Sequence, residues 1–202
     1  MSAQADWRRE RAQSHLLESA DVKRQMVDSC LGSILAAADL IAEAFRSGRK
    51  VLVCGNGGSA ADSQHMAAEF VSRLTSDFQR PGLPAIALTT DTSFLTAYAN
   101  DCSFEGVFER QVQAFGKPGD VLIGISTSGN SENVVRAITA AKSIGMGTIA
   151  LAGEGGSMAR LADVTICVPS SNTQYVQEAH LVIEHIICDL VERLVFGQNG
   201  RD

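Results

Sequence analysis

The sequence contains few aromatic residues, few prolines and no excess of positive charge. Aromatic residues make up 5% of the 202-residue chain, which has 4 prolines and 18 glycines. A core poor in rings is filled with small aliphatic side chains, which favours helices packed closely against a sheet. The 17 Lys and Arg and 23 Asp and Glu give a formal net charge of −6. An acidic chain repels nucleic acid and anionic lipid, so we expect neither a nucleic-acid nor a membrane partner.

The sequence also lacks a C-x-x-C pair, a signal segment and a membrane-length apolar run. Its 5 cysteines are odd in number, and most lie in apolar runs. This is typical of buried, reduced thiols rather than of a thiolate metal site. Residues 1–10 are polar and have no apolar signal core, and no stretch reaches the roughly 18 uncharged apolar residues of a membrane span. These absences predict a cytoplasmic protein.

Hydrophobic spacing separates an N-terminal helical segment, residues 1–48, from the rest of a single domain, residues 49–197. Between residues 6 and 47, apolar residues recur at helical spacing, which predicts one or two amphipathic helices. The apolar residues exceed what one helix face needs. We therefore expect burial against a partner subunit as well as against the chain's own sheet.

Beyond residue 48, short and uniformly apolar runs alternate with helical patterns. Such runs are typical of strands covered on both faces, and the β-α-β order predicts a parallel sheet with right-handed crossovers. The predicted strands are Lys50–Cys54, Ala85–Leu88, Val121–Ile125, Gly147–Ala152 and Val164–Val168. The predicted helices are Ala60–Leu74, Ser93–Phe115, Glu132–Ile144, Ser157–Leu161 and Gln174–Val195.

The first candidate binding loop, Gly55–Ser59, lies between a predicted strand and a predicted helix. Its three glycines, Gly55, Gly57 and Gly58, allow a tight turn and a close approach of the backbone to a ligand. The helix that follows offers free N–H groups and the positive end of its dipole. A simple helix cap explains this loop equally well.

The second loop, Ser126–Ser131, carries four hydroxyls and an amide in six residues, again between a strand and a helix. A helix cap needs one hydroxyl, so the surplus indicates a phosphate site. The loop has no lysine or arginine, which predicts a neutral cradle. Both loops follow strands of a parallel sheet, and ligands bind beyond the carboxyl ends of such strands. We therefore expect one site for a phosphorylated ligand.

A dinucleotide fold is the competing interpretation, because the first loop reads G-x-G-x-x-A. A ribose-binding acid is then expected about 20 residues further on. The first acid after the second predicted strand is Asp91, 36 residues after Gly55. The second hydroxyl-rich loop also has no role in that fold.

Two pairs of polar residues at helical spacing could do chemistry. His65 and Glu69 are four residues apart and share a helix face, so they could bind a divalent metal or act as acid and base, or form an ordinary surface pair. His180 and Glu184 make a rival pair on the last helix. Spacing alone does not choose between His180 and His185.

Four segments of the chain resemble the sugar isomerase (SIS) domain family, and with the N-terminal helices they resemble its phosphoheptose isomerases over nearly the whole chain. The segments read VLVCGNGGSAADSQHMAAEFVSRL, ANDCSFEGVFERQV, GDVLIGISTSGNSENVVRAI and YVQEAHLVIEHIICDLVE. The resemblance implies a three-layer α/β/α fold with a five-stranded parallel sheet. It also implies a homotetramer with active sites between subunits, in which the N-terminal helices serve oligomerisation.

The resemblance implies an aldose–ketose isomerase that converts D-sedoheptulose 7-phosphate to D-glycero-D-manno-heptose 7-phosphate through an enediol. This is the first step of heptose biosynthesis for lipopolysaccharide or capsule. The catalytic pair of the family matches Glu69 as base and His185 as acid. The zinc ligands, one ion per subunit, match His65, Glu69, Gln177 and His185. The substrate-binding residues match Asn56, Gly57, Gly58, Asn100, Asp101, Ser126, Thr127, Ser128, Ser131 and Gln177.

Two features of the last helix bear on this assignment. Gln177 and His185 are eight residues apart, a rise of about 12 Å in one straight helix. Both reach one metal only if the helix starts after Gln177 or if they come from different chains, and we expect a site shared between subunits. Tyr175 also stands where family members often have arginine.

Two non-catalytic alternatives share the fold. One is a SIS tetramer that binds the replication initiator DnaA, and the other is a sugar-phosphate sensor without turnover. The initiator-binding protein lacks the glutamate matching Glu69 and the histidine matching His185. Both are present here, which favours an enzyme.

Overall fold

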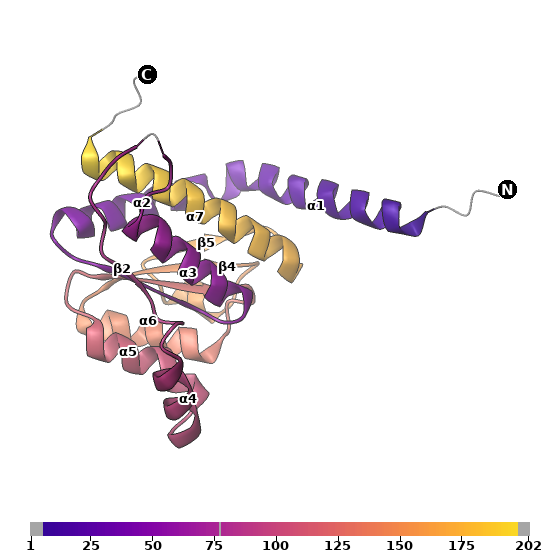
Figure 1. The fold of residues 1–202 in the computed structure, drawn as a ribbon. Coiled ribbons are helices and arrows are strands. Elements are labelled where there is room, and N and C mark those ends of the chain that lie inside the picture. Colours follow the sequence, from indigo (N-terminus) through magenta and orange to yellow (C-terminus); the bar gives the residue numbers. More distant parts are fainter. Residues whose placement is uncertain (1–5, 77, 198–202) are drawn as a thin grey trace.

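The computed structural model describes residues 6–76 and 78–197 and contains a five-stranded parallel sheet between helices (Figure 1). The strands are β1 (Val51–Gly55), β2 (Ala85–Ala87), β3 (Val121–Ser126), β4 (Gly147–Ala152) and β5 (Val164–Cys167). The α-helices are α1 (Trp7–Ser29), α2 (Leu31–Arg46), α3 (Gly58–Val71), α4 (Thr92–Asp101), α5 (Val107–Phe115), α6 (Glu132–Ile144) and α7 (Thr173–Phe196), and the 3₁₀ helices are η1 (Phe104–Gly106) and η2 (Ser157–Arg160). The predicted α/β fold is confirmed.

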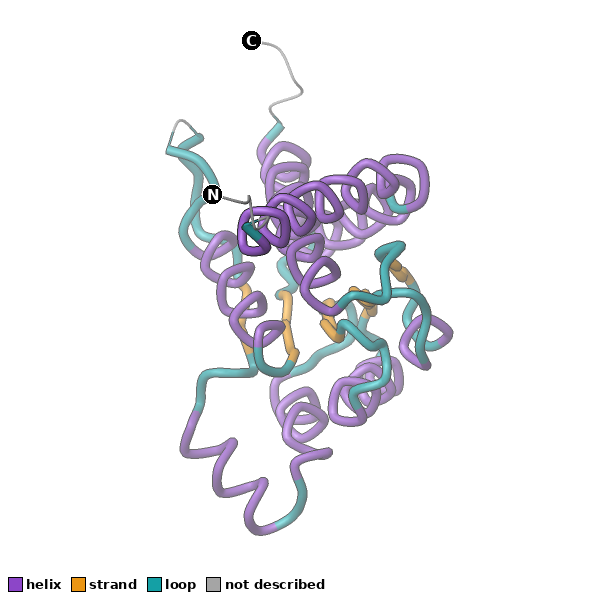
Figure 2. The backbone as a smooth tube through the Cα atoms, turned by 90° about the vertical axis from the view of Figure 1, so that its right-hand side faces the viewer, coloured by secondary structure: helices purple, strands orange, loops and turns teal. Residues whose placement is uncertain are grey.

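The strands are ordered β2-β1-β3-β4-β5, and each neighbouring pair is parallel. Their side chains alternate between two cores, one on each face of the sheet. Val51 and Val53 join a core with α2, α3 and α7, whereas Leu52 and Cys54 join a core with α5 and α6. Figure 2 shows these helices on opposite sides of the strands. Cover on both faces explains why the runs are uniformly apolar.

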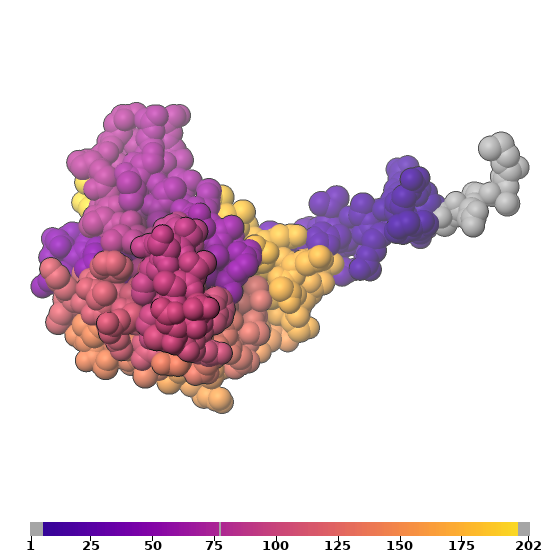
Figure 3. Space-filling view, turned by 60° about the horizontal axis from the view of Figure 1, so that its bottom comes forward, coloured from indigo at the N-terminus to yellow at the C-terminus, as the bar shows by residue number. Residues whose placement is uncertain are grey.

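Helix α1 extends beyond the body of the protein as an arm (Figures 1 and 3). It meets α2 at Cys30 with a bend of 71°. Only Ser19, Val22 and Met26 of α1 are buried. Four large apolar side chains of α1 are between 55% and 71% exposed, namely Trp7, Leu16, Leu17 and Val27. The expected surplus of apolar surface is therefore present. That a partner subunit buries this surface stays a prediction. The domain division at residue 48 also stays a prediction, and residues 1–5 lie outside the described part.

The predicted helix Ser93–Phe115 is divided into α4, η1 and α5. Cys102 has φ −123° and ψ −88°, and Ser103 is extended, so the helical hydrogen-bond ladder stops there. Helix α4 has no buried residue and projects from the lower side of the molecule in Figure 1. Apolar spacing continues across this break and hid it; the one glycine of the segment, Gly106, lies at the end of η1.

Within the described ranges, no single helix is long and apolar enough to span a membrane. Helices α1 and α2 reach that length and composition only as a bent pair.

A buried ion pair fixes the segment that follows α3. Arg80 donates from Nε to Glu192 Oε1 on α7 at 2.8 Å, and its Nη atoms donate to the carbonyls of Phe70 and Glu69, each at 2.7 Å. Both side chains are almost fully buried, at 1% and 2% exposed. The pair therefore ties the end of α3 to α7.

We predict that Arg80→Met lowers the free energy of unfolding by about 3–5 kcal/mol, because it leaves the Glu192 carboxylate buried without its partner. Arg193→Met is the matched control. It breaks an exposed pair with Asp189 and should cost at most about 1 kcal/mol. Urea unfolding at one protein concentration measures both. Equal losses in the two variants would contradict the account.

Candidate functional site

The two predicted loops lie side by side because β1 and β3 are neighbours in register, with Gly55 opposite Ile125. Both loops leave the carboxyl ends of these strands. The first loop is short, since α3 already begins at Gly58. Gly57 has φ +56°, and a Cβ at Gly55 would lie 2.7 Å from the Ser59 carbonyl oxygen. Glycine is therefore required for this turn.

The second loop gathers its hydroxyls at the start of α6. Ser126 Oγ lies 2.9 Å from Ser131 Oγ and 3.3 Å from Ser128 Oγ. The Ser131 hydroxyl does not cap α6 and instead shares a hydrogen bond with Ser126, so the hydroxyls are held together as a cluster. The Thr127 carbonyl accepts a hydrogen bond from Gly153 N at 3.1 Å, which holds the loop to the segment after β4. The geometry is that of a preformed, neutral phosphate cradle.

A reciprocal amide pair joins the two loops. Asn56 Nδ2 donates to Asn133 Oδ1, and Asn133 Nδ2 donates to Asn56 Oδ1, each at 2.9 Å. Asn133 lies in the first turn of α6 and is buried. Asn133 is not among the residues that the sequence predicted for the site. Its only signal is an amide in the apolar stretch that follows the second loop.

Helices α3 and α7 pack together and bring three of the predicted catalytic and metal residues to one place. His65 Nε2 lies 2.8 Å from His185 Nε2, and His65 Nε2 lies 3.6 Å from Glu69 Oε1. Two imidazole nitrogens and a carboxylate oxygen are a donor set that zinc takes. Within the described ranges, no group of three or more His, Cys, Asp or Glu side chains is placed to hold a metal ion. The zinc site therefore stays a prediction, supported here only by the types of donor atom.

Gln177 is not brought to this cluster within one chain. Its side chain lies against Gly58, where a Cβ would be 2.0 Å from Gln177 Nε2, and it interacts with the Asp62 carboxylate. Because α7 begins at Thr173, Gln177 and His185 lie on one continuous helix. The alternative that the helix starts after Gln177 is therefore wrong, and a site shared between chains stays a prediction.

Asn100 and Asp101 lie at the end of α4 and are exposed. Asn100 Nδ2 donates to Asp101 Oδ1 at 2.8 Å. Among the described residues, neither side chain makes a hydrogen bond to either loop. The structure therefore separates this pair from the rest of the predicted site within one chain.

The rival pair, His180 and Glu184, faces the interior. His180 is completely buried, and its Nε2 lies 3.3 Å from the Ala152 carbonyl oxygen. Burial lowers the pKa of His180 to about 4. Burial, together with the Asp62 carboxylate, raises the pKa of Glu184 to about 9. An enclosed pair cannot meet a substrate, so the geometry favours His185 over His180.

Tyr175 joins the start of α7 to the α1 arm. Its hydroxyl donates to Glu18 Oε2 at 2.9 Å, and its ring lies edge-on to His15, 4.7 Å between centroids. Glu178 Oε1 lies 2.8 Å from His15 Nε2. Tyr175 thus makes a contact within the chain at the position where the family often has arginine.

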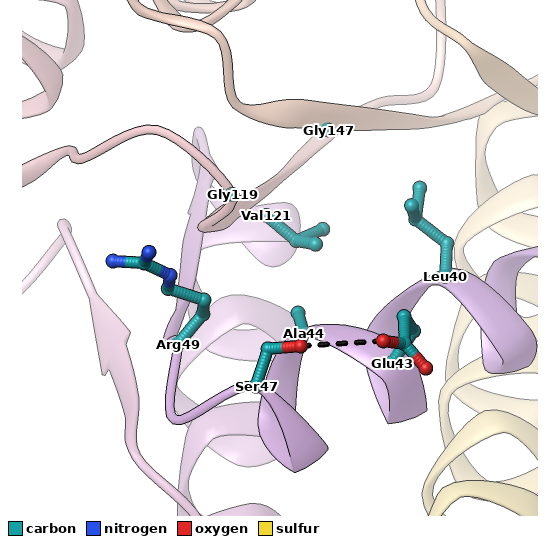
Figure 4. A pocket seen from close by; sticks show the side chains of 8 residues that line it. All are labelled: Leu40, Glu43, Ala44, Ser47, Arg49, Gly119, Val121 and Gly147. Atoms are coloured by element: carbon teal, nitrogen blue, oxygen red, sulfur yellow. Dashed lines mark hydrogen bonds between the residues drawn. The ribbon is translucent and has the colours of Figure 1, made fainter.

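A separate pocket of about 380 Å³ opens at the opposite edge of the sheet (Figure 4). It lies beside α2 and the amino ends of β3 and β4. Its lining contains none of the predicted site residues and consists of Leu40, Glu43, Ala44, Ser47, Arg49, Gly119, Val121 and Gly147.

The parallel sheet, with the hydroxyl-rich loop and the glycine turn side by side at the carboxyl ends of its strands, defines an α/β protein of the class in which ligands bind at that edge. A family model described as "SIS domain" matches residues 15–153. A phosphoheptose isomerase of Roseiflexus sp. (strain RS-1) is 53% identical over 89% of this chain and 91% of its own length. That of Clostridium acetobutylicum is 56% identical over 82% and 84%.

Solved structures agree with these relatives. The phosphoheptose isomerase GmhA from Neisseria gonorrhoeae is 43% identical, with a TM-score of 0.85 over 91% of this chain and 97% of that chain. The phosphoheptose isomerase from Francisella tularensis is 36% identical, with a TM-score of 0.87 over the same shares. The chain belongs to the phosphoheptose isomerase family of SIS-domain proteins.

We predict a stability loss on acidification that depends on His180. Its pKa is lower in the folded than in the unfolded protein, so the unfolded state binds more protons as the pH falls below about 6.5. Between pH 7 and 5, this group should cost about 2 kcal/mol of unfolding free energy. Urea unfolding of wild type and His180→Asn at both pH values measures the difference. A variant with the same pH slope as wild type would refute the assignment.

Proposed function

We propose that the chain is an aldose–ketose isomerase that converts D-sedoheptulose 7-phosphate to D-glycero-D-manno-heptose 7-phosphate, the first step of heptose biosynthesis for lipopolysaccharide or capsule. The observation that carries the proposal is the meeting of Glu69 and His185, from α3 and α7, around His65. This meeting is supported by membership of a family whose close relatives bear the name phosphoheptose isomerase. We propose a cytoplasmic location, in keeping with reduced thiols.

The reaction moves a proton between neighbouring carbons through an enediol. One group must therefore take a proton from carbon while another donates a proton to an oxygen. The Glu69 carboxylate is the base and the His185 imidazole is the acid in our proposal. The side chain of Glu69 is 19% exposed, which leaves it partly shielded from water yet open to a substrate. The second loop holds the phosphate and thereby orients the sugar against these groups.

We propose one zinc ion per subunit, held by His65, Glu69 and His185 of one chain, with the Gln177 side chain of a second subunit as a further ligand. The imidazole and carboxylate donors are of the kinds that zinc takes. When bound, zinc would polarise the carbonyl oxygen and stabilise negative charge on it. The residues of the chain still do the proton transfers.

The proposed assembly is a homotetramer with active sites between subunits. Three features of the single chain support it. The α1 arm carries exposed apolar side chains, Gln177 is eight residues from His185 on one helix, and Asn100 and Asp101 project on α4 away from their own loops. In the proposed tetramer, each of these three groups would contact a second subunit.

We predict that Glu69→Gln lowers kcat by about 10²–10⁴-fold, because an amide cannot take the proton from carbon. The variant should stay folded, since Glu69 contributes only its backbone carbonyl to the Arg80 contact. Glu43→Gln, at the opposite edge of the sheet, is the matched control and should keep wild-type turnover. Product analysis after incubation with sedoheptulose 7-phosphate measures both. Near-normal turnover in Glu69→Gln would overturn the assignment.

We predict that treatment with a chelator abolishes most turnover and that added zinc restores it, because the ion lowers the energy of the charged intermediate. Metal content measured beside product formation checks this. Full turnover in metal-free protein would contradict the zinc proposal and leave the isomerase proposal standing. Thermal stabilisation by the sugar phosphate without any product would favour the sensor, and capture of DnaA without product would favour the initiator-binding alternative.

A further inference from the structure

Asn133 connects two parts of the site through hydrogen bonds of its side-chain amide. Its amide exchanges two hydrogen bonds with Asn56, both at 2.9 Å, and its side chain is almost fully buried, with 4% of the residue exposed. Beyond the β1–β3 ladder, no other hydrogen bond among the described residues joins residues 55–59 to residues 126–133. Beyond the ends of β1 and β3, this pair is therefore the hydrogen-bonded link that holds the two loops at a set spacing.

A reciprocal amide pair fixes orientation as well as distance. Each amide contributes one N–H and one oxygen lone pair, and the two parallel bonds keep both side chains nearly in one plane. Asn56 lies in the turn that leads into α3, and Asn133 lies two residues after Ser131 of the phosphate loop. Movement of either loop would break both bonds together.

The distance between these loops corresponds to a distance along the substrate. The phosphate lies at the second loop, whereas the reacting carbons lie near Glu69, on the helix that starts in the first loop. A longer or shorter sugar phosphate would place a different pair of carbons at Glu69. A fixed loop spacing therefore selects the length of the carbon chain.

We propose that Asn133 is a positioning residue that acts through Asn56 to set the spacing between the phosphate loop and the reaction centre, and so determines the chain length of the sugar phosphate. This inference rests on the proposed function. Asn133 itself touches no substrate in this account. A displacement of about 1 Å at a reacting centre can cost about 100-fold in rate, so the loss of the pair should have a measurable effect on turnover.

The test compares wild type, Asn133→Ala and Asn133→Asp with Gln111→Leu as the matched control. Gln111 is also a buried amide, whose Nε2 donates to the Leu88 carbonyl at 2.9 Å, but among the described residues it makes no hydrogen bond to either loop. Three quantities are measured for each protein. They are the affinity for inorganic phosphate, the kcat and KM for sedoheptulose 7-phosphate, and the thermal stabilisation by seven-carbon against six-carbon ketose phosphates.

Asn133→Ala should bind inorganic phosphate as wild type does, lose about 10–100-fold in kcat, and discriminate less between seven-carbon and six-carbon ligands. Asn133→Asp keeps an acceptor for Asn56 Nδ2 and should fall between the two, so it supplies the test if the alanine variant does not fold. Gln111→Leu should lose stability and keep the wild-type discrimination.

Unchanged discrimination in both Asn133 variants would overturn the proposal, as would a parallel loss of phosphate affinity. Discrimination lost equally in Gln111→Leu would reduce Asn133 to a general structural role. Failure of the proposed function looks different. Wild type would then form no product, while the thermal measurements still report whether Asn133 controls ligand length.

Discussion

The parallel pairing of β1 with β3 is the contact on which the rest of the site depends. Both strands are completely buried, so their register is held by cores on both faces. This register brings the glycine turn at Gly57 and the hydroxyl cradle at Ser126 to one edge of the sheet. The same turn starts α3, whose later residues His65 and Glu69 then reach α7. One strand pair thus positions both the proposed phosphate loop and the proposed proton-transfer residues.

The packing of α3 on α7 places the proposed catalytic pair and also encloses polar groups. Asp62 Oδ2, His180 Nδ1 and both carboxylate oxygens of Glu184 are buried without a hydrogen-bond partner among the described residues. Polar atoms of this kind cost free energy. Of these groups, Asp62 interacts with Gln177, on the helix that carries His185. The packing of α3 on α7, which assembles the proposed site, therefore also lowers the stability of the fold through these unsatisfied polar atoms.

The sequence predicted the sheet well, because strands such as Val121–Ser126 are covered on both faces and must be apolar throughout. It also predicted both loops, since their glycines and hydroxyls have few other uses. Helical spacing could not find the break at Cys102 or choose between His180 and His185, because both depend on tertiary packing; the choice of His185 came from the family resemblance. Asn133 could not be predicted for the same reason, because only the folded structure places its amide opposite that of Asn56.

The central claim is that Glu69 and His185 act on a sugar phosphate whose phosphate is held by the second loop. The most direct measurement follows D-sedoheptulose 7-phosphate with the zinc-loaded protein by nuclear magnetic resonance. The account predicts that the ketose signal falls while the signal of an aldose C1, that of D-glycero-D-manno-heptose 7-phosphate, appears. Recovery of the ketose unchanged, under conditions where the protein binds it, would contradict the account.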